Sequence, residues 1–139
     1  MYKRILTFMV WAVIASLILA ACGGAPEKAE IPVFPQATPD TGKYEDVRKT
    51  AEDREIAAIP EMNIEIKAYT TIASLDEVIS FYNDTLADWG TAKRTDEPQS
   101  KMTQMKWVKN DNQVFNLFYV PSGAIGEDTV LMIEQAWAK

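Results

Sequence analysis

The chain carries few of the residue types on which enzymes rely. It has no histidine, which excludes His-assisted serine or cysteine catalysis and imidazole metal ligands. It contains no GxGxxG or GxxxxGK[ST] phosphate-binding loop. The chemistry that remains open uses carboxylates, a serine–lysine pair or oxygen ligands. The sequence therefore predicts no catalytic residue, no bound cofactor and no metal site.

Two short clusters of oxygen-bearing side chains have simpler roles than catalysis. Asp76 and Glu77 are adjacent carboxylates in the expected first turn of a helix, where the helix dipole and the cap account for them. Asn110, Asp111 and Asn112 offer oxygen ligands for Ca²⁺, but they lack the alternating spacing, the glycine and the distant glutamate of a calcium loop. We expect these three residues to form a hairpin turn.

Cys22 is the only cysteine, and it directly follows a hydrophobic N-terminus. Lys3 and Arg4 give the chain a short positive start, and residues 5–19 contain no charge. This layout is typical of a secretory signal peptide. The segment Leu19-Ala20-Ala21-Cys22 resembles the lipobox of bacterial lipoproteins. The resemblance implies cleavage before Cys22, a diacylglycerol thioether on its sulfur and an acylated new N-terminus.

Two other interpretations of the N-terminus stay open. Residues 5–26 are uncharged, and these 22 residues are long enough to span a bilayer without cleavage. An ordinary secreted protein could also carry a cysteine near its cleavage site by chance. Because the cysteine is unique, the four-residue match is complete and a Gly/Pro segment follows it, the sequence favours the lipoprotein.

The expected boundaries are a signal peptide over residues 1–21, a lipidated cysteine with a flexible tether over 22–30, and one domain over 31–139. Two or three acyl chains would hold such a domain firmly, since each buried methylene contributes about 0.8 kcal/mol. We therefore expect the protein in the cell envelope, anchored by lipid outside the cytoplasm, on either the inner or the outer membrane. The mature chain would have 12 basic and 20 acidic side chains, so nucleic acid is not an expected partner.

The hydrophobic pattern predicts two helices and one strand in the first part of the domain. Residues 44–59 are rich in good helix formers and carry a thin apolar stripe. Residues 62–72 alternate between apolar and polar side chains, which predicts a strand with Ile72 on its apolar side. Residues 74–89 repeat apolar side chains at intervals of three and four and begin with the Ser-x-x-Glu pattern of a capping box, which predicts the main helix.

The second part of the domain reads as a loop over residues 91–100 and three more strands. The strands are expected at about 102–109, 113–120 and 128–137. The whole order predicts an α+β fold: an antiparallel sheet of about four strands with the main helix, about 74–89, packed on one face. A second, short helix, about 44–59, is expected to cover the other face together with Ile31–Phe34, or else a partner covers it.

The start of the domain and its main helix resemble a type of small bacterial lipoprotein and secreted domain. Those proteins carry a PVYPGA segment and then the pattern YxT, V, FY and L. The matching residues here are Pro32-Val33-Phe34-Pro35, Tyr69, Thr71, Ser74, Val78, Phe81, Tyr82 and Leu86. The chain departs from the pattern at Gln36, where glycine is usual, and at Trp89-Gly90, which reverses the usual Gly-Trp. The resemblance implies a small α+β domain and no particular activity.

A surplus of apolar side chains predicts a partner surface. The strand at 113–120 is apolar on both sides, and such a strand is normally covered on both sides. Because the apolar stripe of the helix at about 44–59 is thin, we expect an exposed apolar patch on the sheet. Such a patch often marks an interaction site. The residues expected to form it are Phe118, Val108, Val120 and Tyr69.

The expected function is a membrane-tethered module that binds or assembles an envelope protein or glycan without catalysis. The alternative is a small hydrolase of the carboxylate type that acts on envelope polymers. The chain has few residue types suited to catalysis and a small domain, and both features favour the binding module.

Overall fold

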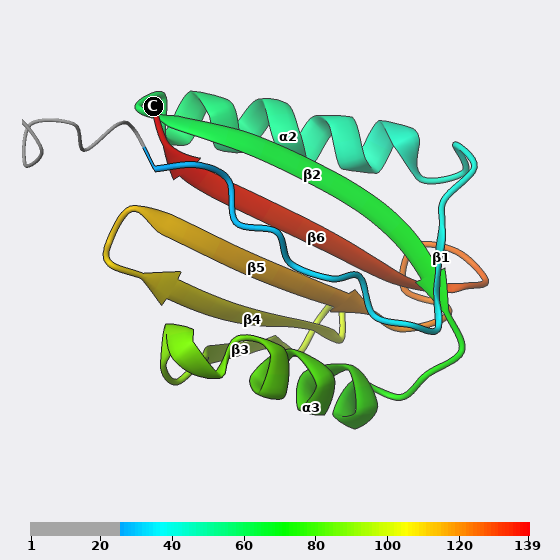
Figure 1. Cartoon of the computed structure of the whole chain (residues 1–139). Helices are drawn as coiled ribbons and strands as arrows, with labels where there is room; N and C mark the ends of the chain where they lie inside the picture. The colour runs from blue at the N-terminus through cyan, green and yellow to red at the C-terminus, as the bar shows by residue number, and fades with distance from the viewer. Residues whose placement is uncertain (1–25) are drawn as a thin grey trace, which may run out of the picture.

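A computed structural model describes residues 26–139 as one antiparallel sheet of six strands with two α-helices, one on each face (Figure 1). This arrangement confirms the predicted α+β class. The predictions for the signal peptide, for Cys22 and for the first part of the tether lie outside the described residues.

The sheet has the strand order β1-β2-β6-β5-β4-β3, and every neighbouring pair is antiparallel. Its strands are β1 (Ala37–Pro39), β2 (Met62–Thr71), β3 (Lys93–Glu97), β4 (Met102–Lys109), β5 (Gln113–Val120) and β6 (Thr129–Ala138). The helices are α2 (Glu45–Ala58) and α3 (Leu75–Thr85), and a short 3₁₀ helix, η1 (Ala87–Trp89), follows α3. The four predicted strands form the centre of the sheet, so the prediction of about four strands is only roughly right.

The two additional strands lie at the edges of the sheet and carry weak sequence signals. All five side chains of β3, with the sequence KRTDE, are exposed, so no alternation of apolar and polar residues reveals it. β1 has three residues and ends at Pro39, which cannot donate to a strand ladder. Both strands therefore depend on pairing with their neighbours, β4 and β2, rather than on burial of their own side chains.

The main helix, α3, covers one face of the sheet as predicted. Its capping box is complete: Ser74 accepts from the backbone N–H of Glu77, and Glu77 accepts from the backbone N–H of Ser74. Val78, Tyr82 and Leu86 are buried. They belong to a core that also contains Phe34, Tyr69, Met105, Trp107, Phe115, Leu117, Leu131 and Ile133.

The other helix, α2, lies on the opposite face of the sheet (Figure 1). Tyr44 just before it is buried, but no residue within the helix is. Arg48 reaches the sheet and donates from its guanidinium to the carbonyl oxygen of Ile66 in β2 at 3.1 Å. The buried apolar cluster on this face consists of Tyr44, Ile66, Ala68, Val120, Val130 and Met132. The contact of α2 with the sheet is thus partly polar, in agreement with its thin apolar stripe.

Two sequence-based placements are wrong. The segment Ile31–Phe34 packs on the α3 face and not beside α2, because the ring of Phe34 meets that of Phe81 in α3 at a centroid distance of 5.5 Å. Ile72 is 97% exposed instead of facing the core. β2 ends at Thr71, so the alternation of the strand does not extend to Ile72.

Candidate functional site

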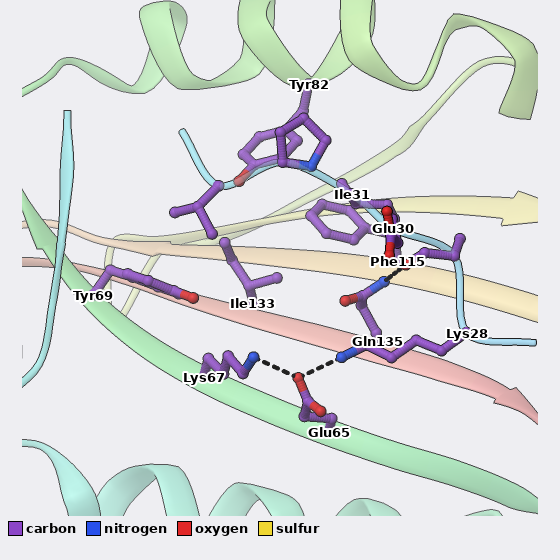
Figure 2. Close-up of a pocket in the computed structure, with 13 residues that line it drawn as sticks. Lys28, Glu30, Ile31, Glu65, Lys67, Tyr69, Tyr82, Phe115, Ile133 and Gln135 are labelled. Atoms are coloured by element: carbon purple, nitrogen blue, oxygen red, sulfur yellow. Dashed lines mark hydrogen bonds and ion pairs between the residues drawn. The ribbon is translucent and has the colours of Figure 1, made fainter. Parts of the chain in front are cut away.

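A pocket of about 590 Å³ lies between the N-terminal segment, residues 26–34, and the sheet face that α3 also covers (Figure 2). Figure 1 shows this segment, in blue to cyan, running along the sheet before the chain reaches β1. A volume of this size is within the range of small-molecule sites. We refer to it as the strap pocket, because residues 28–33 form one of its walls.

The floor of the strap pocket is apolar and aromatic. Tyr82 of α3, Phe115 of β5 and Ile133 of β6 line it, and the first two rings have centroids 4.9 Å apart. Burial raises the pKa of Tyr82 to about 12, so its hydroxyl keeps its proton at neutral pH. Figure 2 shows Tyr69 of β2 pointing into the same space. Tyr82 and Phe115 are 0% and 1% exposed, so they form the buried base of the pocket.

Charged side chains form the rim along β2. Lys28 and Lys67 both place their ammonium nitrogens on Oε1 of Glu65, at 2.6 Å and 2.9 Å (Figure 2). The hydrogen bond from Lys28 is the main cause that holds the pKa of Glu65 below its ordinary value, and Lys67 adds to it. The hydrogen bond to Glu65 raises the pKa of Lys67 in turn. Glu65 therefore stays ionised at neutral pH, whereas a general acid needs a raised pKa.

The N-terminal segment is fastened to the sheet through its backbone as well. Gln135 of β6 donates from Nε2 to the carbonyl oxygen of Ala29 at 2.9 Å, and Gln113 of β5 donates to that of Glu27 at 3.3 Å. These residues were expected to belong to a flexible tether over 22–30. From Glu27 onward the segment instead forms hydrogen bonds with the sheet.

A second pocket, of about 180 Å³, lies between α2 and the opposite face of the sheet. Its distinctive residue is Glu134 of β6, which is 2% exposed. Glu134 is not among the residues predicted from the sequence. The available signal was a single carboxylate inside the apolar run of the last predicted strand, VLMIEQAW. We refer to this space as the Glu134 pocket.

The structure separates the four residues of the predicted partner surface. Val120 and Tyr69 are buried in the two cores, although Tyr69 also borders the strap pocket. Val108 is 38% exposed, and Phe118 is half-buried and lines the Glu134 pocket. Phe118 pairs with Gln104 in the sheet, so it lies four positions along β4 from Val108. The two remaining residues share a face of the sheet without forming one patch.

The clusters of oxygen-bearing side chains have the local roles expected for them. The backbone N–H of Ser74 lowers the pKa of Glu77 most, and the Ser74 hydroxyl lowers it further. Glu77 therefore acts as a helix cap. Asn110 and Asp111 form the turn between β4 and β5, with φ angles of 53° and 57°. Both central residues of a type I′ hairpin turn adopt such angles. Within residues 26–139, no three His, Cys, Asp or Glu side chains group as metal ligands do.

Comparisons with protein-family models, with curated proteins and with solved structures found no match for this chain. None of the helices in the described part of the chain is both long and apolar enough to cross a membrane. The features that bear on function are therefore the strap pocket, the Glu134 pocket and the N-terminal sequence around Cys22.

Proposed function

We propose that this protein is a lipid-anchored lipoprotein of the cell envelope, and that its domain is a non-catalytic module that binds a partner in the strap pocket. The observation that carries the proposal is the position of residues 28–33. They begin six positions after the expected lipidation site at Cys22, and they also form a wall of the pocket.

The chain length between anchor and pocket supports a site close to the membrane. Lys28 lies six positions after Cys22, and a fully extended chain of that length covers at most about 22 Å. A domain anchored at Cys22 would therefore hold the strap pocket within this distance of the lipid. A partner in the envelope would meet the pocket without a long tether.

The lining favours a glycan over a folded protein as the partner. The pocket is walled on one side by the N-terminal segment, so a flat protein surface does not fit into it. Pro32 and Val33 are exposed and offer apolar contact for a sugar, and the charged rim offers donors and acceptors for hydroxyl groups. The site thus combines apolar contact with polar groups that set orientation.

A hydrolase of the carboxylate type has less support. Such enzymes use two carboxyl groups across the scissile bond, one of them with a raised pKa. In the strap pocket Glu65 is ion-paired with two lysines and its pKa is lowered. Glu134, whose pKa burial raises, lies on the other face of the sheet beneath α2.

Photo-cross-linking in intact cells would test the proposal. A photoreactive residue in place of Val33, which lines the strap pocket and is 41% exposed, should capture a glycan whose mass shift a glycosidase removes. The matched control is the same residue at Asp84, which is exposed on α3. Identical products from both positions, or a product that proteases alone remove, would contradict a glycan partner in this pocket.

A further inference from the structure

The Glu134 pocket contains a buried carboxyl group without a cationic partner. Within residues 26–139, its recorded hydrogen bond comes from Nδ2 of Asn116 at 2.8 Å, and it forms no ion pair. Asn116 is held in turn by Nε2 of Gln104, which donates to its Oδ1 at 3.2 Å. This chain of amides turns the donor side of Asn116 toward Glu134. The carboxyl group is therefore fixed in place at the side of the pocket.

On the sheet side, the rest of the pocket wall is apolar and adaptable. Ile66, Met102, Phe118 and Met132 line it from four different strands. A cavity of about 150 Å³ with such walls is large enough to hold benzene. At about 180 Å³, this pocket has room for a body of similar size. Methionine side chains adjust to an irregular shape, and the ring of Phe118 can lie against a cation.

The charges around Glu134 do not neutralise it. Glu55 of α2 lines the pocket and adds a second negative charge. Arg54 of α2 lies at the exposed edge, and Lys106 of β4 acts on Glu134 only through space. Burial accordingly raises the pKa of Glu134, with Asn116 opposing the shift. A ligand with a positive charge would supply the cationic partner that Glu134 lacks among the described residues.

We propose that the Glu134 pocket binds a small primary ammonium ion whose apolar body has about the size of a benzene ring. The ammonium group would pair with the Glu134 carboxylate, and the body would lie against Phe118, Met102 and Met132. This inference does not depend on the proposed function, because the pocket lies on the opposite face of the sheet from the N-terminal segment.

Proton balance gives the site a pH dependence. The ligand brings its own proton, so a protonated Glu134 must release one to solvent when the ion pair forms. Binding should therefore strengthen as the pH rises above 4.5, the ordinary pKa of a glutamate. The other charged groups facing this carboxyl are Glu55 and Arg54 from α2 and Lys106 from β4.

Calorimetric titration of the full chain in non-ionic detergent tests the site, with benzylammonium as the probe. Benzyl alcohol is the matched probe, because it has nearly the same shape and no charge. We expect one saturable site that binds benzylammonium about ten-fold more tightly or better than the alcohol, as a charged hydrogen bond requires. Glu134→Gln should weaken benzylammonium binding by a similar factor, whereas Glu127→Gln, at an exposed loop position, should leave it unchanged.

Equal affinity for the two probes would overturn the proposal, and so would unchanged affinity in Glu134→Gln. Ala51→Leu provides a second test if Glu134→Gln does not fold. Ala51 lines the pocket from α2, so the larger side chain fills the space and leaves every charge in place. Loss of benzylammonium binding in this variant supports the proposal, and retained binding overturns it.

Discussion

The hydroxyl of Tyr82 accepts a hydrogen bond from the backbone N–H of Phe34 at 3.1 Å, although 48 positions separate the two residues. The bond joins the N-terminal segment to α3 at the floor of the strap pocket. The ring of Phe34 is itself buried in the core beneath α3. The segment is therefore part of the folded domain, and the pocket that it walls depends on this attachment.

Tyr82→Phe should lower the free energy of unfolding by about 1–3 kcal/mol, because it leaves the buried N–H of Phe34 without an acceptor. Urea denaturation measures the change. Tyr69→Phe is the control: it removes a hydroxyl from the same pocket for which no hydrogen bond is recorded among the described residues. Equal losses in the two variants would show that the bond to Phe34 adds no stability.

Leu86→Ala should lower the free energy of unfolding by about 2–5 kcal/mol, since Leu86 is buried in the core beneath α3 and truncation leaves a cavity. Asp84→Ala, on the exposed side of the same helix, should change it by less than about 0.5 kcal/mol. Thermal and chemical denaturation of both variants would compare them. Similar changes at the two sites would mean that the helix does not pack as described.

Cys22→Ser should abolish incorporation of labelled palmitate and leave the precursor uncleaved. The reason is that the sulfur of Cys22 is the only thiol in the chain that could carry the lipid. Ser16→Ala, within the hydrophobic stretch, is the matched control and should leave labelling intact. Mass spectrometry that finds Met1 and a free thiol in protein from native membranes would rule out the lipoprotein.

Glu65→Gln should loosen the N-terminal segment, because Lys28 and Lys67 lose the negative charge with which both form ion pairs. The lowered pKa of Glu65 means that its ion pairs stabilise the fold above pH 4.5, the ordinary value, and are lost as the pH falls through the folded-state value. The partly exposed pairs contribute about 0.2–1 kcal/mol. Hydrogen exchange at residues 27–33 should therefore be faster in the variant at pH 7 and should match the wild type in acid.

Glu134→Gln should change the pH dependence of stability in the opposite direction from Glu65→Gln. Because burial raises the pKa of Glu134, the folded state holds this proton more tightly than the unfolded state does. That contribution is fully present below pH 4.5 and is lost as the pH rises through the folded-state value. The variant should therefore gain stability relative to the wild type between acid and neutral pH, as measured by urea denaturation. A constant difference across that range would contradict the burial of an uncompensated carboxyl.

The two helices and the four central strands could be predicted because each has its own repeat of apolar side chains. The repeat of Val78, Tyr82 and Leu86 and the Ser74–Glu77 cap define α3 locally, and the structure has both. β3 could not be found in this way, since KRTDE owes its conformation to pairing with β4. An edge strand of this kind is visible only once its partner is in place.

The pockets could not be predicted because both depend on contacts between distant parts of the chain. Glu65 meets Lys28 across 37 positions, and nothing in either local sequence indicates the pair. Glu134 is unusual only because α2 covers it and Asn116 turns toward it. Of the residues predicted as a partner surface, Phe118 lines the Glu134 pocket, whereas Val120 and Tyr69 are buried in the cores by contacts with distant elements.

The composition of β3 matters if the domain is anchored on a crowded membrane as proposed. Proteins confined to two dimensions collide often and in similar orientations, which favours the joining of sheets along open edges. At this edge every side chain is exposed, and Lys93, Arg94, Asp96 and Glu97 carry charge. Charged, short edge strands discourage such joining. If the domain is anchored as proposed, neighbouring copies can therefore lie side by side at high density without fusing their sheets into aggregates.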